Sequence, residues 1–229
     1  MYLNSFVKRA NNTIRSYEAP MKYLTSRGLS DSDINKFSIG YVKYVHIKDD
    51  KSDDYKYLYN KSYSFNYLKN KIIFPLKNTI GNVNGIITRD LEKKIYMQYF
   101  LSEAKDIGAF FGLYEAIDHI KKSGKVFVHE GAFDAISFSK VFPNTVSSLT
   151  SFLNEQQYET LKFLVDKIIL VYDNDDAGKT GIKKMLDYYG DKNIEVVSIG
   201  DEDSNSYLKF LGEDKFKSYI KSKIPHYLL

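Results

Sequence analysis

Acidic residues follow three apolar stretches of the chain, and their type and spacing are suited to holding a divalent cation. The main candidates are Glu130 after KVFVH, Asp173 and Asp175 after KIILVY, and Asp203 in the acidic run after IEVVSIG. In an extended segment, side chains two residues apart point to the same side, so Asp173 and Asp175 are expected to project together. Two carboxylates held that close repel each other unless a cation lies between them. The alternative is that they are solvated turn residues or helix N-caps, a role also open to Asp176.

The stretch VYDNDDAGKTG (residues 171–181) does not match two better-known loops that bind phosphate or calcium. A phosphate-binding P-loop needs Gly-x-x-x-x-Gly-Lys-Ser/Thr, and Asp173 stands where the first Gly belongs. An EF-hand loop needs an acidic or amide side chain at its fifth position and Glu at its twelfth. Counted from Asp173, those positions hold Ala177 and Lys184. Both loops are therefore excluded.

The elements that must position the acidic residues are predicted by the apolar runs after residue 125. Short apolar runs alternate with amphipathic stretches, which predicts a parallel sheet whose strands are joined by right-handed helical crossovers. Strands are expected at KVFVHE, TVSSL, KIILVYD and IEVVSIG, with helices at AFDAISFSKVF, NEQQYETLKFLVD and AGKTGIKKMLDYYG. In such sheets, ligands bind at the carboxyl ends of the strands.

Glu130, Asp173 and Asp203 would therefore meet at one edge of the predicted sheet. Asp134 lies four residues after Glu130, one helical turn on, and could reach the same edge. Carboxylates without His or Cys are the hard oxygen ligands that suit Mg²⁺ or Mn²⁺. Such sites clamp phosphoryl oxygens during an in-line displacement.

The first part of the chain shows a different pattern. Residues 1–40 are predicted to be helical, with Gly28 ending one helix and Ser30 capping the next. Asp33 stands at the capping-box position of that second helix. Residues 48–66 are polar and without periodicity, which predicts an exposed loop.

Short β-rich runs follow that loop. NKIIFPLKN and NVNGIITRDL predict an antiparallel hairpin, and KKIYMQYFL predicts a third strand. The stretch from residue 112 to residue 124 predicts a short amphipathic helix that ends at Gly124.

The composition excludes several classes of protein. The 229 residues are 43% hydrophobic, enough for one large domain or two small ones. The chain has no Cys, which excludes a disulfide framework and a thiolate zinc site. The net charge of +4 permits nucleic-acid binding without arguing for it. No signal peptide and no apolar run near the ~20 residues of a membrane span occur, so a cytoplasmic protein without a membrane partner is expected.

Several motifs resemble those of a known family. EGAFDAISF and VYDNDDAGKTGIKK resemble the Glu-Gly and Asp-x-Asp motifs of Toprim domains, the metal-binding module of bacterial-type primases, topoisomerases and some nucleases. Three further segments resemble DnaG-type bacterial DNA primases: YLTSRGLSDSDINKFSIGYV, NKIIFPLKNTIGNVNGIITR and FGLYEA. The resemblance covers most of residues 20–220, with the motifs in the family's order.

The resemblance implies a fold and a set of site residues. The fold class is α/β, with a Toprim domain at residues 116–229 that includes a short helical C-terminus. A smaller mixed α+β subdomain at residues 1–115 precedes it and contacts template and nucleotide. The implied catalytic residues are Glu130, Asp173 and Asp175, which also bind metal, with Asp134 and Asp203 supporting. The implied nucleotide- or DNA-binding residues are Lys71, Arg89 and Lys77.

The implied activity is that of a DNA primase core, a DNA-directed RNA polymerase and nucleotidyltransferase. It would join ribonucleoside triphosphates into short RNA primers on a single-stranded DNA template, using two or more Mg²⁺ or Mn²⁺ ions and no zinc. The expected location is the cytoplasm, including that of a phage-infected bacterium. One alternative is a Toprim metal-dependent nuclease. Another is a non-catalytic DNA-binding replication factor or inhibitor of a host primase.

The chain also departs from the family pattern. Asp106 stands at a family Lys, Thr150-Ser151 stands at a family Gly-Thr, and Asn205 stands at a family carboxylate. The family's zinc-binding and helicase-binding domains have no counterpart in the sequence, so a separate protein for template selection or helicase coupling is expected. The apolar tail either docks that protein or packs onto the core; its residues are Ile224, Tyr227, Leu228 and Leu229.

Overall fold

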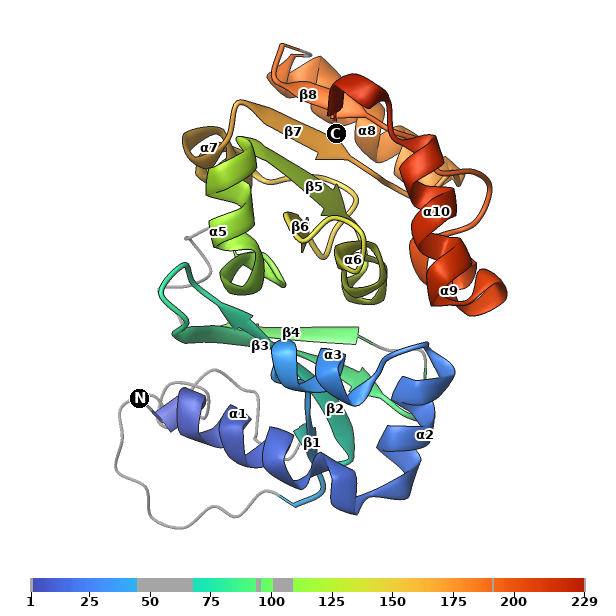
Figure 1. Cartoon of the computed structure of the whole chain (residues 1–229). Helices are drawn as coiled ribbons and strands as arrows, with labels where there is room; N and C mark the ends of the chain where they lie inside the picture. Colours follow the sequence, from blue (N-terminus) through green and yellow to red (C-terminus); the bar gives the residue numbers. More distant parts are fainter. Residues whose placement is uncertain (1, 45–67, 94–95, 101–108, 191, 229) are drawn as a thin grey trace. The chain divides into compact units, whose positions relative to one another are not determined.

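The computed structural model describes residues 2–44, 68–93, 96–100, 109–190 and 192–228. The chain divides into two compact units, Met1–Ala109 and Phe110–Leu229 (Figure 1). The predicted boundary after residue 115 falls inside helix α5 (Leu113–Ser123), whose apolar residues are buried in the core of the second unit.

The first unit is built on a four-stranded antiparallel sheet with the strand order β1-β2-β3-β4. The strands are β1 (Gly40–Val42), β2 (Lys71–Lys77), β3 (Val83–Asp90) and β4 (Tyr96–Phe100). The helices are α1 (Tyr2–Thr13), η1 (Ile14–Ser16), α2 (Glu18–Ser26) and α3 (Asp31–Lys36). The predicted hairpin and third strand are confirmed, and the apolar face of α1 packs on the sheet in one hydrophobic cluster.

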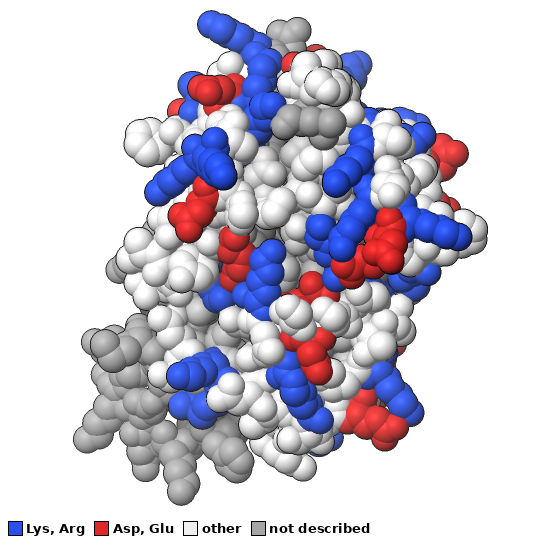
Figure 2. Space-filling view, in the orientation of Figure 1, with Lys and Arg blue, Asp and Glu red and all other residues white. Residues whose placement is uncertain are grey.

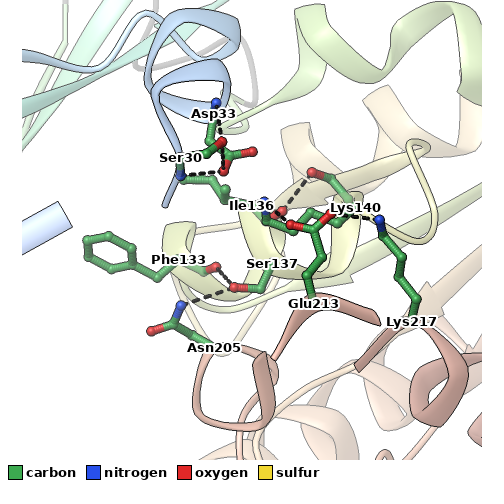
Figure 3. Close-up of polar contacts among 10 residues, drawn as sticks. Ser30, Asp33, Phe133, Ile136, Ser137, Lys140, Asn205, Glu213 and Lys217 are labelled. Carbon is green, nitrogen blue, oxygen red and sulfur yellow. Dashed lines mark hydrogen bonds and ion pairs between the residues drawn. The ribbon is translucent and has the colours of Figure 1, made fainter. Parts of the chain in front are cut away.

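The helix boundaries of the first unit follow from local chemistry. Ser30 and Asp33 form a reciprocal capping box at the start of α3, as predicted, in which the Asp33 carboxylate accepts the Ser30 N–H at 2.8 Å (Figure 3). Gly28 follows α2 with a φ of +76°, in the left-handed region that favours glycine. The loop predicted at residues 48–66 lies outside the described residues.

The second unit contains the predicted parallel sheet, with the strand order β6-β5-β7-β8. The strands are β5 (Lys125–His129), β6 (Thr145–Ser147), β7 (Lys167–Leu170) and β8 (Ile194–Val196). The remaining helices are α6 (Ala132–Ser139), α7 (Glu155–Leu164), α8 (Asp176–Tyr189), α9 (Ser204–Leu211), α10 (Glu213–Lys223) and η4 (His226–Leu228). The α/β fold class is therefore confirmed.

Alternate strand residues enter two different hydrophobic clusters. Val126 and Val128 of β5 pack with residues of α5, α7 and α8, whereas Phe127 packs with residues of α6, α9 and α10. This alternation buries both faces of the sheet, as parallel sheets require. Helices consequently flank the sheet on both sides (Figure 1).

The apolar tail belongs to the second of these clusters. Ile224 and Leu228 are each 4% exposed and pack with α10, while Tyr227 is exposed. Of the two expectations for the tail, packing onto the core is the one observed for Ile224 and Leu228. Leu229 lies outside the described residues. Across the part of the chain that the structure describes, no helix has the length and apolar character of a membrane span.

Candidate metal centre

Glu130 lies directly after β5, where that strand runs into α6. Its backbone carbonyl accepts a hydrogen bond from the Ser147 hydroxyl at 2.8 Å, which ties it to β6. Its side chain is half-buried, and Oε1 is buried without a hydrogen-bond partner. Burial, followed by the charges of Asp173 and Asp175, raises the pKa of Glu130 to about 7.

Asp173 lies three residues beyond the end of β7 and is also half-buried. Burial, followed by the charges of Asp203 and Asp175, raises the pKa of Asp173. Carboxylates that follow β5, β7 and β8 therefore lie close enough for their charges to interact. The structure brings Glu130, Asp173, Asp175 and Asp203 to the same edge of the sheet.

Asp175 is exposed and caps helix α8. Its Oδ1 accepts the backbone N–H of Gly178 at 2.8 Å, and Asp176 is the first residue of the helix. The helix N-cap alternative is therefore observed for Asp175 and not for Asp176, because the Asp175 side chain reaches the free amide. One carboxylate oxygen of Asp175 stays outside this hydrogen bond.

Gly178 lets the first turn of α8 approach the other acidic residues. A Cβ at Gly178 would overlap the carbonyl oxygen of Asp173 and would lie 3.0 Å from Oε1 of Glu130. Glycine is therefore needed at this position for the close approach of the helix to the two carboxyl-bearing residues.

Asp134 and Asn205 tie α6 to the start of α9. Oδ1 of Asp134 accepts the backbone N–H of Asn205 at 3.0 Å, and the fully buried Asn205 amide donates to the Ser137 hydroxyl at 3.0 Å (Figure 3). Asp203 caps α9 by accepting the backbone N–H of Ser206. Asn205, at the position of a family carboxylate, thus faces α6 and holds two helices together.

The two acidic loops are also connected directly. The side-chain amide of Asn174 donates to Oδ1 of Asp201 at 3.3 Å. Asp201 and Glu202 are exposed. The loop after β7 and the loop after β8 therefore contact each other at the carboxyl edge of the sheet.

The residues at this edge fit a divalent cation. Oε1 of Glu130 has no partner, and burial, followed by neighbouring carboxylates, raises the pKa of Glu130 and of Asp173, so a bound cation would relieve both conditions. Among the described residues, no three acidic or His side chains lie close enough to coordinate one ion as they stand. Binding would therefore draw the carboxylates together.

Two buried residues next to the acidic cluster were missed by the sequence analysis. His129 is 2% exposed, its ring lies 4.6 Å from that of Phe138, and burial lowers its pKa to about 3, so it is neutral. The Tyr172 hydroxyl lies 3.2 Å from that of Ser148, and burial raises the pKa of Tyr172. Their apolar strand context signalled burial, but no local pattern signalled their place beside the site.

The three predicted basic residues of the first unit contact other residues of that unit. Lys71 forms an ion pair with Asp90 at 3.4 Å, and Lys77 donates to the Ser38 hydroxyl at 2.8 Å. Arg89 is 8% exposed, and its Nε donates to the Tyr23 hydroxyl at 2.9 Å. Arg89 is thus part of the folded interior, whereas Lys71 and Lys77 are half-buried. Asp106 lies outside the described residues.

Surface charge is mixed in sign. On the face shown in Figure 2, Lys and Arg side chains are interspersed with Asp and Glu. This agrees with the modest net charge of +4. Electrostatic attraction for a nucleic-acid backbone is therefore expected to be moderate.

Two family models match the chain, one on each unit. The model described as "DNA primase catalytic core, N-terminal domain" matches residues 6–107, and the model described as "Toprim-like" matches residues 127–208. The acidic residues from Glu130 to Asp203 all lie within the second match.

Curated relatives of the chain are DNA primases. The DNA primase of Lactococcus lactis is 29% identical over 214 residues, which is 85% of this chain and 34% of that protein. The DNA primase of Aquifex aeolicus is 27% identical over 88% of this chain and 44% of that protein. The chain thus spans less than half the length of these relatives.

Solved structures of primases share the fold. The zinc-binding and RNA polymerase domains of Aquifex aeolicus primase match with a TM-score of 0.77 and 26% identity, over 95% of this chain and 60% of that chain. A DnaG primase catalytic domain bound to single-stranded DNA matches with a TM-score of 0.75 and 20% identity, over 98% of this chain and 79% of that chain.

Proposed function

Because the chain belongs to the family of DnaG-type DNA primase catalytic cores, we propose that it synthesises short RNA primers on single-stranded DNA. The observation that carries the proposal is the group of carboxylates at the carboxyl ends of β5, β7 and β8. Glu130 and Asp173 there have raised pKa values and lie in the Toprim-like region.

The carboxylates would hold two divalent ions, Mg²⁺ or Mn²⁺. The proposed ligands are Glu130, Asp173, Asp175 and Asp203, supported by Asp134. When bound, the ions would neutralise the charge of the triphosphate and lower the barrier to attack of the 3′-hydroxyl on the α-phosphorus, from which pyrophosphate leaves. Oε1 of Glu130 is buried without a hydrogen-bond partner, and this residue is the proposed proton acceptor for the attacking 3′-hydroxyl.

The first unit would hold nucleotide and template. Lys71 is the best-placed candidate, because its partner Asp90 is a half-buried carboxylate that a phosphate could replace. Lys77 is a second candidate. Arg89 is buried and donates a hydrogen bond to the Tyr23 hydroxyl, so its proposed role is to stabilise the sheet that carries Lys71 and Lys77. The proposed division of labour is template and nucleotide contact in the first unit, Met1–Ala109, and catalysis in the second unit, Phe110–Leu229.

The proposed partners are a single-stranded DNA template and ribonucleoside triphosphates, acting in the cytoplasm. A separate protein that selects the template or couples to the helicase stays a prediction. The mixed surface charge favours it, because a core with moderate electrostatic attraction would gain from help in holding DNA.

One assay separates the candidate functions. The purified chain is incubated with single-stranded DNA, labelled ribonucleotides and Mg²⁺ or Mn²⁺, and the products are resolved by size. Labelled RNA products support a primase, shortened DNA supports the nuclease alternative, and unchanged substrates support a non-catalytic factor. Glu130→Gln is the test variant and Glu92→Gln, which changes an exposed carboxylate of the first unit, is the matched control.

A further inference from the structure

The loop from Val197 to Asp203 carries the acidic residues that follow β8, and its backbone needs support to place them. Val197 and Ile199 anchor the loop in the core, each 5% exposed. Gly200 then turns the chain with a φ of +126°, a conformation that other residues rarely adopt. Asp201 and Asp203 follow this turn.

Two tyrosine hydroxyls hold the backbone on either side of Gly200. The Tyr219 hydroxyl of α10 donates to the carbonyl of Ile199 at 2.6 Å, and the backbone N–H of Asp201 donates to the Tyr207 hydroxyl of α9 at 3.2 Å. The two rings contact each other with centroids 4.7 Å apart. A Cβ on Gly200 would overlap the Tyr207 hydroxyl.

The Tyr219 hydroxyl keeps the proton that it donates to the Ile199 carbonyl. Burial, followed by the Tyr207 hydroxyl and the charge of Asp201, raises the pKa of Tyr219 to about 12. A phenol is already protonated at neutral pH at its ordinary pKa of about 10, so the Tyr219 hydroxyl can donate its hydrogen bond to the Ile199 carbonyl.

Helix α10, which carries Tyr219, is itself firmly attached to the rest of the unit. Phe216 and Ile220 are fully buried in the core. Near its start, Glu213 forms ion pairs with Lys140, the C-cap residue of α6, at 3.2 Å and with Lys217 at 2.6 Å (Figure 3). The support that Tyr219 gives to the loop thus reaches back to α6, the helix that follows Glu130.

We infer that Tyr219 is a positioning residue for the metal centre, acting through the backbone of residues 199–201 to place Asp203 beside Asp173. The inference rests on the proposed function. Tyr219 contacts backbone rather than ion or substrate, so its effect is on where a ligand lies. The charge of Asp203 raises the pKa of Asp173, so the two carboxylates lie near each other. Loss of the Tyr219 hydrogen bond would let the loop move Asp203 away from Asp173 and would weaken cation binding there.

The test is Mn²⁺ binding by the metal-free full chain, measured by calorimetric titration for wild type, Tyr219→Phe and the control Tyr227→Phe. Tyr227 is 68% exposed and keeps its backbone contact in the control. The hydroxyl deletion at Tyr219 is expected to weaken Mn²⁺ binding about tenfold, the lower end of the loss seen when groups that orient metal ligands are removed. The control is expected to bind as wild type does.

Several results would overturn the inference. Wild-type Mn²⁺ affinity in Tyr219→Phe, with or without a lower melting temperature, would show a merely structural role. An absence of Mn²⁺ binding in wild type would overturn the metal centre and the inference together, which keeps the two failures distinguishable. If Tyr219→Phe loses helical content, Tyr207→Phe tests the same loop from its other side and is expected to weaken binding in the same direction.

Discussion

At the scale of single residues, Glu130 is the carboxylate of the cluster whose pKa is raised to about 7, by burial and then by neighbouring carboxylates. Its free carboxylate oxygen and its pKa of about 7 follow from its place after a buried strand and beside Asp173. The sequence alone predicted the residue and its neighbours, because strand ends and acidic spacing are local patterns. The sequence did not predict that Asn205 joins two helices. Its partners Asp134 and Ser137 precede it in the chain by 71 and 68 residues, and no local pattern links positions so far apart.

The raised pKa of Glu130 has a consequence for stability without metal. The folded-state pKa of about 7 lies above the usual 4.5, so its contribution is fully present below pH 4.5 and is lost as the pH rises toward 7. After discounting for the half-exposed side chain, the loss is about 1–2 kcal/mol. Glu130→Gln in EDTA is therefore expected to flatten the fall in the free energy of unfolding over this range, measured by urea denaturation. An unchanged pH profile in this variant would contradict the assignment, and Glu92→Gln serves as the control.

Lys71 and Arg89 are expected to respond differently to truncation. Log affinity for single-stranded DNA falls as log salt rises. Lys71→Ala should make this fall less steep by about one unit of slope, with little effect on folding. Arg89→Ala should instead lower stability by about 1–3 kcal/mol, because it removes a buried hydrogen bond to Tyr23 and its packing. Anisotropy titrations over a range of salt and thermal melts separate the two. Equal salt slopes for wild type and Lys71→Ala would remove Lys71 from the DNA surface.

At the scale of elements, the alternation of strands and helices in the second unit could be predicted from the sequence, because each of its strands is a short apolar run. The capping box of Ser30 and Asp33 predicted one helix start in the same way. The contacts that hold α9 and α10 to the rest of the second unit could not be predicted from the sequence. They depend on single hydroxyl and amide groups, such as those of Tyr219 and Asn205, whose partners lie on distant elements.

The contact between α6 and α9 can be measured with a double-mutant cycle. Ser137→Ala and Asn205→Ala each remove one partner of a buried hydrogen bond, and the coupling between them is expected to be about 1 kcal/mol in the free energy of unfolding. Additive effects of the two substitutions would show that this hydrogen bond does not join the helices.

The first turn of α8 sets the spacing of the carboxylates. Gly178→Ala is expected to cost about 1–3 kcal/mol of stability, because the added methyl would overlap the carbonyl oxygen of Asp173. The exposed neighbour Lys179→Ala is the matched control in the same helix. Thermal denaturation checks both. A stable Gly178→Ala variant with unchanged Mn²⁺ binding would mean that this close approach is dispensable.

At the scale of the whole molecule, the chain has two compact units for which we propose different tasks. The first has the antiparallel sheet and basic residues matched by the primase N-terminal family model, and the second has the carboxylates of the Toprim-like region. On the face shown in Figure 2, Lys and Arg are interspersed with Asp and Glu, so we assign the proposed chemistry to the carboxylate cluster and not to a broad electrostatic field. The central claim is therefore that a divalent ion binds where β5, β7 and β8 end.

The most direct test of that claim is the free energy of unfolding of the full chain with and without Mn²⁺, compared between wild type and the double variant Asp173→Asn, Asp175→Asn. Asn keeps the size of both side chains and can still cap α8. At Mn²⁺ about a hundredfold above its dissociation constant, wild type should gain about 2–3 kcal/mol, and the double variant should gain almost nothing. Equal stabilisation of both proteins, or none of wild type, would contradict the metal centre.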